Sequence, residues 1–127
     1  MALIPQAKRN VAVLGASPKP DRYSNQALRL LAKLDYRPLP VNPAFPEIEG
    51  MTCFPNLAAI EEAVHTVTLY LRESRSTPMI DDILAAKPQR IIMNPGAEND
   101  ELAAAASSAG IEVVEACTLV MLRTGLF

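Results

Sequence analysis

The sequence predicts an α/β domain with an open, doubly wound, mainly parallel five-stranded sheet and helices on both faces. Four short, nearly unbroken apolar runs occupy residues 11–14, 67–71, 90–93 and 111–114. Runs that are apolar on both faces are typical of parallel strands covered by helices, whereas half-exposed strands alternate. Helical patterns separate these runs, and this alternation favours right-handed crossovers between neighbouring strands.

The fifth strand is predicted at residues 36–41, between the first and second apolar runs. Pro38 and Pro40 interrupt it and remove backbone donors, which favours a position at the sheet edge or at a strand end. Further prolines follow as far as Pro55, so residues 38–55 are expected to include one long ordered loop.

Helices are predicted at residues 25–34, 57–64, 76–86 and 99–109. In the first of them Leu28 and Leu31 share one face, and the last ends at Gly110, a helix stop. The apolar tail, residues 119–127, is expected to pack on the sheet, with a dimer contact as the alternative. These elements predict a single Rossmann-like domain over residues 1–127.

Composition limits the classes of partner. A chain of 127 residues can bury a hydrophobic core without disulfide bonds or structural metal ions. Its formal net charge of -2 gives no general attraction to nucleic acid or anionic membrane. No segment approaches the roughly 20 apolar residues of a membrane span. Cys53 and Cys117 lack CxxC spacing and only His65 accompanies them, so neither a metal site nor a redox motif is indicated. We therefore expect reduced thiols in a cytoplasmic protein.

Small and polar residues follow every predicted strand. They are Gly15-Ala16-Ser17, Val41-Asn42-Pro43, Leu71-Arg72, Asn94-Pro95-Gly96 and Ala116-Cys117-Thr118. Each set alone is typical of an ordinary turn between a strand and a helix. Ligands of open α/β sheets bind beyond the carboxyl ends of the strands, so five such sets at one edge indicate a site there. His65 is expected at the opposite edge.

The turn after the first strand differs from the dinucleotide fingerprint G-x-G-x-x-G. Only Gly15 is present, Ser17 takes the second glycine's place, and the turn extends through residues 18–22 before Ser24 or Asn25 can cap the helix. The second strand also ends without an acidic residue for a ribose. The longer loop suits a ligand richer in phosphate, because helix-start amides, serine hydroxyls and the cations Lys19 and Arg22 can all bind phosphate.

Four motifs together resemble the small stand-alone CoA-binding proteins, which are related to the N-terminal nucleotide-binding domain of the succinyl-CoA synthetase α subunit. The motifs are G-A-S-P-K-P-D-R-Y-S-N at 15–25, P-V-N-P at 40–43, N-P-G-A-E-N at 94–99 and E-A-C-T at 115–118. The resemblance covers nearly the whole chain and implies coenzyme A or an acyl-CoA as ligand. It implies three groups of site residues. The phosphates are held by Gly15, Ser17, Lys19, Arg22 and Ser24, with Ala16 and Pro18 among them. The adenosine is bordered by Val41, Asn42 and Pro43, and the crevice is lined by Leu71, Arg72, Asn94 and Gly96, with Asn99 and Cys117 as further members.

Three functions remain open at this point. The first is a module that binds CoA without catalytic or metal-binding residues, working alone, as a homo-oligomer or with a partner protein. The second is an enzyme, either one that uses NAD(P) or one that acts on CoA thioesters with Cys117 as nucleophile. The third is a protein-interaction domain whose nucleotide site is vestigial.

Overall fold

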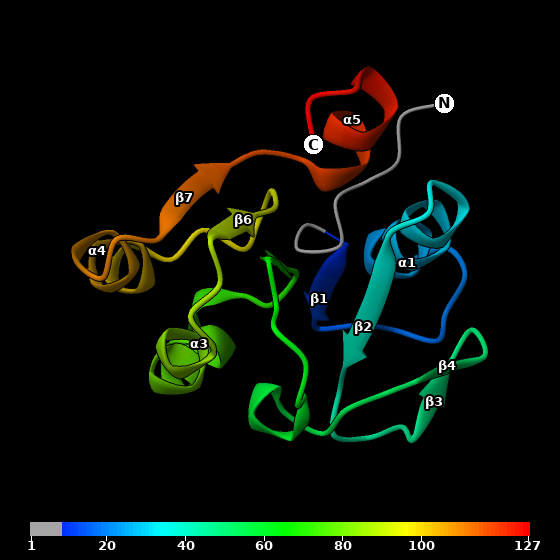
Figure 1. The fold of residues 1–127 in the computed structure, drawn as a ribbon, viewed down its shortest axis with the longest axis horizontal. Coiled ribbons are helices and arrows are strands. Elements are labelled where there is room, and N and C mark those ends of the chain that lie inside the picture. The colour runs from blue at the N-terminus through cyan, green and yellow to red at the C-terminus, as the bar shows by residue number, and fades with distance from the viewer. Residues whose placement is uncertain (1–8) are drawn as a thin grey trace.

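The computed structural model describes residues 9–127 and confirms the α/β fold (Figure 1). Its five-stranded sheet has the order β2-β1-β5-β6-β7, and every neighbouring pair is parallel. The strands are β1 (Asn10–Leu14), β2 (Arg37–Val41), β5 (Thr66–Leu69), β6 (Arg90–Met93) and β7 (Glu112–Glu115). The chain builds outward from β1 to β2 on one side and from β5 to β7 on the other. A topological switch point therefore lies between the carboxyl ends of β1 and β5.

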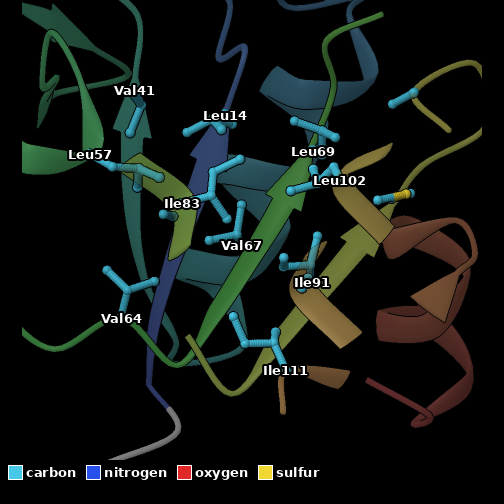
Figure 2. Packing of buried hydrophobic residues seen from close by; sticks show 14 of the residues in the cluster. Leu14, Val41, Leu57, Val64, Val67, Leu69, Ile83, Ile91, Leu102 and Ile111 are labelled. Carbon is cyan, nitrogen blue, oxygen red and sulfur yellow. The ribbon is translucent and has the colours of Figure 1, made fainter. Parts of the chain in front are cut away.

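Helices cover both faces of the sheet (Figure 1). On one face α1 (Tyr23–Lys33) and α5 (Thr118–Thr124) pack on Val11 and Val13 of β1 through Leu28 and Leu122. On the other face α3 (Ile80–Ala86) and α4 (Asp100–Ser108) pack on the alternate residues of the strands. Figure 2 shows this second cluster, in which Leu14, Leu69 and Ile91 meet helix residues such as Ile83 and Leu102. The two-residue period of a strand thus divides the core into two layers.

The segment after β2 contains more regular structure than the predicted loop. It holds a hairpin of β3 (Glu47–Ile48) and β4 (Met51–Thr52), and the two linking residues, Glu49 and Gly50, have φ of 53° and 74°. Positive φ at both positions is typical of the type I′ turn, one of the two common two-residue hairpin loops. Phe54 then donates its N–H to Pro40 O at 2.9 Å, so this segment covers the edge of β2. The edge position predicted for this strand is confirmed.

Three helix predictions need correction. The helix predicted at 57–64 is wrong: only the single 3-10 turn η2 (Leu57–Ala59) forms, and Ile60 is already extended. The helix predicted at 76–86 is interrupted. The chain forms α2 (Glu73–Ser76), the 3-10 turn η3 (Thr77–Met79) and then α3, since Pro78 has no N–H to continue a regular helix. The first helix begins at Tyr23, so Ser24 and Asn25 lie inside it and neither caps it. Strand β5 also ends earlier than predicted, at Leu69.

The C-terminal tail packs on the sheet, as predicted. Leu119 and Leu122 of α5 are buried, and the final residue, Phe127, meets the Tyr36 ring edge to face with ring centroids 5.0 Å apart. The Arg90 guanidinium lies over the same ring, 4.4 Å from its centroid. None of the helices within residues 9–127 is long and apolar enough to cross a membrane.

Candidate functional site

A cleft of about 520 Å³ opens at the switch point between β1 and β5. We call it the polar cleft. The β1–α1 connection forms one wall, the segment after β5 forms another, and the turn after β6 closes it. Its lining residues are Gly15, Ala16, Ser17, Lys19, Arg22, Tyr23, Ser24, Asn42, Tyr70, Leu71, Arg72, Arg75, Pro95, Gly96 and Ala97.

A second hollow of about 390 Å³ adjoins the polar cleft between the ends of β1 and β2. We call it the apolar hollow. It is lined by Leu14, Gly15, Val41, Asn42, Pro43, Ala44, Leu71, Ser74, Arg75 and Met79. Gly15, Asn42, Leu71 and Arg75 line both spaces, so the two meet along a shared wall.

The polar cleft is strongly cationic. Lys19, Arg22, Arg72 and Arg75 line it, and none of its lining residues within the described part of the chain is an aspartate or glutamate. The chain as a whole has a formal net charge of -2. The cleft is therefore locally positive in a chain of slightly negative net charge, and this local charge favours an anionic ligand.

The loop between β1 and α1 is fixed by side chains that bind its carbonyl groups. Asn42 Nδ2 donates to Ala16 O at 2.8 Å, Asn25 Nδ2 donates to Ser17 O at 2.9 Å, and Arg29 Nη2 donates to Pro20 O at 2.8 Å. Asn25 also donates to Glu49 Oε2 at 3.1 Å, which joins the loop to the β3–β4 hairpin. The loop is therefore held in place from β2, from α1 and from the hairpin.

The start of α1 leaves backbone donors available beside the cleft. Arg22 is the N-cap residue, and its side chain makes no capping hydrogen bond. The first N–H groups of any helix have no partner within the helix. Because Tyr23 and Ser24 line the cleft, these donors and the positive end of the helix dipole lie next to its cations.

Most of the residues that the sequence suggested for the site border one of the two spaces. They are Gly15, Ala16, Ser17, Lys19, Arg22, Ser24, Val41, Asn42, Pro43, Leu71, Arg72 and Gly96. Pro18, Asn94, Asn99 and Cys117 border neither.

Asn94 and Asn99 are buried and hold the fold together. Asn94 Nδ2 donates to Thr68 Oγ1 at 2.8 Å and to Leu69 O at 2.9 Å, while its Oδ1 accepts from the Thr118 N–H at 2.8 Å. Asn99 caps α4 by accepting from the Leu102 N–H at 3.1 Å. Cys117 is half-buried at the N-cap of α5.

Arg75 and Tyr70 are among the lining residues that the sequence did not suggest. The sequence predicts that the helix begins at residue 76, which leaves Arg75 outside it and outside the predicted site. The signal for Arg75 is its position three residues after Arg72, just past a strand end. Tyr70 was assigned to the strand, but β5 ends at Leu69 and Tyr70 reaches the cleft.

The Tyr70 hydroxyl is buried and makes no hydrogen bond with any residue of the described chain. Burial raises its pKa to about 12, and the neighbouring Thr68 and Thr118 hydroxyls oppose that rise. The group is therefore a neutral phenol at physiological pH.

We expect Tyr70 to be a late-titrating tyrosine in an alkaline absorbance titration of the folded protein, ionising near pH 12. A pKa above the ordinary 10.0 means that the folded state holds this proton more tightly than the unfolded state. The resulting stability is complete below pH 10 and is lost as the pH rises towards 12. Tyr70→Phe should remove this loss and leave stability at neutral pH unchanged or slightly raised, because the deleted hydroxyl has no partner. An unaltered titration curve in the variant would contradict the assignment.

Comparison with known proteins identifies relatives of this chain. A crystal structure of an uncharacterized protein has 39% sequence identity and a TM-score of 0.88, covering 94% of this chain and 98% of that one. The uncharacterized protein YneT of Bacillus subtilis (strain 168) is 25% identical over 96 residues, 76% of this chain and 71% of YneT. Acetyl-coenzyme A synthetase 1 of Ca. Korarchaeum cryptofilum, solved with phosphate and ADP, is 25% identical with a TM-score of 0.74, covering 85% of this chain but 25% of the synthetase.

The family comparison covers the whole sheet and both walls of the polar cleft. The model of the CoA binding domain matches residues 9–123, from the start of β1 into α5. The chain belongs to the CoA-binding domain family.

Proposed function

We propose that this single domain binds coenzyme A or an acyl-CoA non-covalently and carries out no chemistry on it. The observation that supports this most directly is the polar cleft. It has four cationic side chains and, among the lining residues that the structure describes, no carboxylate, in a chain of the CoA-binding domain family. The similarity to an acetyl-coenzyme A synthetase supports the same ligand class.

In this proposal the diphosphate of CoA lies at the start of α1. The free N–H groups of the first helical turn, the hydroxyls of Ser17 and Ser24, and the cations Lys19 and Arg22 supply donors of the kind that bind phosphate oxygens. The adenine occupies the apolar hollow beside Val41 and Pro43. The pantetheine arm then leaves along the turn after β6, beside Gly96.

The lining of the cleft favours binding over catalysis. Within the described chain, none of the lining residues is a histidine, cysteine, aspartate or glutamate, which are the usual proton acceptors and nucleophiles. Tyr70 stays protonated because its pKa is about 12. Cys117, the nucleophile of the enzyme alternative, borders neither space, and Asn42 stands where an NAD site would have an acid.

We expect CoA and acetyl-CoA to raise the melting temperature of protein that has first been stripped of carried-over ligand. A ligand at about 100 times its dissociation constant stabilises the fold by roughly 2.7 kcal/mol. Arg22→Ala and Ser17→Ala should each reduce this rise because they remove phosphate contacts. Arg123→Ala, an exposed arginine in the last turn of α5, should leave it unchanged.

The melting temperature of the protein is measured in parallel with NAD, NADP and ATP, each added separately. A rise with NAD or NADP alone would replace the proposal with a dinucleotide-binding function. No rise with any of the five compounds would favour an interaction domain with a vestigial site.

A further inference from the structure

Arg75 lies where the polar cleft and the apolar hollow meet. Among the residues that the structure describes, four line both spaces, Gly15, Asn42, Leu71 and Arg75, and only Arg75 of these is charged. A nucleotide with its base in the hollow and its diphosphate in the cleft must pass its ribose along this shared wall. Arg75 is therefore beside the ribose of any ligand bound in this way.

The four cations of the cleft form two groups from different parts of the chain. Lys19 and Arg22 belong to the β1–α1 connection, next to the free N–H groups of α1. Arg72 and Arg75 belong to one turn after β5, where the Arg75 N–H donates to Arg72 O at 2.9 Å. A single diphosphate at the start of α1 uses the first group and leaves the second without an anion.

The second group has its side chains available. Both arginines are exposed, and across residues 9–127 neither guanidinium takes part in an ion pair or a side-chain hydrogen bond. Two arginines that line the same cleft suit a phosphomonoester, which carries between one and two negative charges near neutral pH and accepts paired hydrogen bonds from a planar guanidinium.

We propose, building on the CoA-binding function above, that Arg75, assisted by Arg72, binds the phosphate on the ribose of CoA. Arg75 then determines specificity: it selects CoA over dephospho-CoA, which has the same adenine, diphosphate and pantetheine but no ribose phosphate. The two arginines recognise the ribose phosphate, and the β1–α1 loop recognises the diphosphate that both ligands share.

Isothermal titration calorimetry with CoA and dephospho-CoA tests this division on stripped wild-type protein and three variants. Wild type should bind CoA about tenfold or more tightly than dephospho-CoA, the scale of one charge-assisted phosphate contact. Arg75→Gln should lose most of that preference by weakening CoA alone, with dephospho-CoA affinity kept within about twofold. Arg22→Gln should weaken both ligands by similar factors, and Arg123→Gln should weaken neither. Melting curves of each variant establish that it is folded.

Each result separates this inference from the function on which it rests. Equal affinity of wild type for the two ligands would overturn the ribose-phosphate assignment and leave CoA binding intact. A similar loss for both ligands in Arg75→Gln would also overturn it, because Arg75 would then act on the diphosphate. Absence of binding to either ligand would overturn the proposed function itself.

Discussion

Asn94→Ala is expected to lower the free energy of unfolding by about 3 kcal/mol, although Asn94 borders neither space of the site. Its amide is buried and links the end of β6 to two other elements: it donates to Thr68 and Leu69 of β5 and accepts from the Thr118 N–H at the start of α5. Alanine leaves that N–H buried without its partner and opens a small void. A buried donor without a partner costs about 1–3 kcal/mol, and the void adds to this.

Urea denaturation of Asn94→Ala and Asn56→Ala, compared with wild type, tests this expectation. Asn56 is a suitable control because its side chain also accepts from a backbone N–H, that of Ala59, but at an exposed position. Loss of such a cap should cost about 1 kcal/mol. Equal losses in the two variants would mean that burial of the Asn94 network contributes no stability of its own.

The same residue shows what the sequence could not predict. Asn94 follows β6 at the correct edge of the sheet, and that much could be predicted from the apolar run before it and the Asn-Pro turn. Whether a side chain at a strand end points into the cleft or into the core depends on which face it occupies. Asn94 shares the face of Ile92 and meets Thr118 there, so its contact depends on where the C-terminal helix packs.

The sheet and the main site loop were predictable because their signals are local. Apolar runs and the Gly15-to-Arg22 loop need no information from distant parts of the chain. The helix predicted at 57–64 does not form, for the opposite reason. Its composition suits a helix, but Ile60 and Val64 pack into the core formed by the sheet, α3 and α4. The chain must be extended there to begin β5. Tertiary packing overrode the local preference.

The positive charge of the site was only partly predictable. Lys19 and Arg22 belong to a contiguous motif, whereas Arg75 reaches the cleft because Pro78 divides the following helix and a short α2 forms ahead of it. The boundary of a short helix depends on such details. The cleft thus proved more cationic than the sequence alone indicated.

Gly15→Ala is the second change with a large expected effect, about 3 kcal/mol of unfolding free energy together with weaker CoA binding. Gly15 has a φ of 87°, which side chains rarely adopt, and an added Cβ would lie 2.9 Å from Leu71 Cδ2 and 3.2 Å from the Tyr70 carbonyl carbon. The Leu71 side chain can move, but the Tyr70 backbone belongs to the wall of the cleft. The substitution should therefore push apart the ends of β1 and β5, where both spaces meet.

Gly110→Ala isolates the steric part of this effect. Gly110 has a similar φ of 81°, but an added Cβ would meet nothing within 4 Å. This variant should lose only about 1–2 kcal/mol, the cost of the left-handed backbone alone, and should bind CoA as wild type does. Denaturation and CoA titration of both variants would then separate backbone strain from the close approach of β1 to Tyr70.

If the two variants lost equal stability and bound CoA equally, the contact at Gly15 would not be what keeps the cleft in shape. A larger loss confined to Gly15→Ala would mean that the absence of one side chain at the end of β1 sets the width of the cleft.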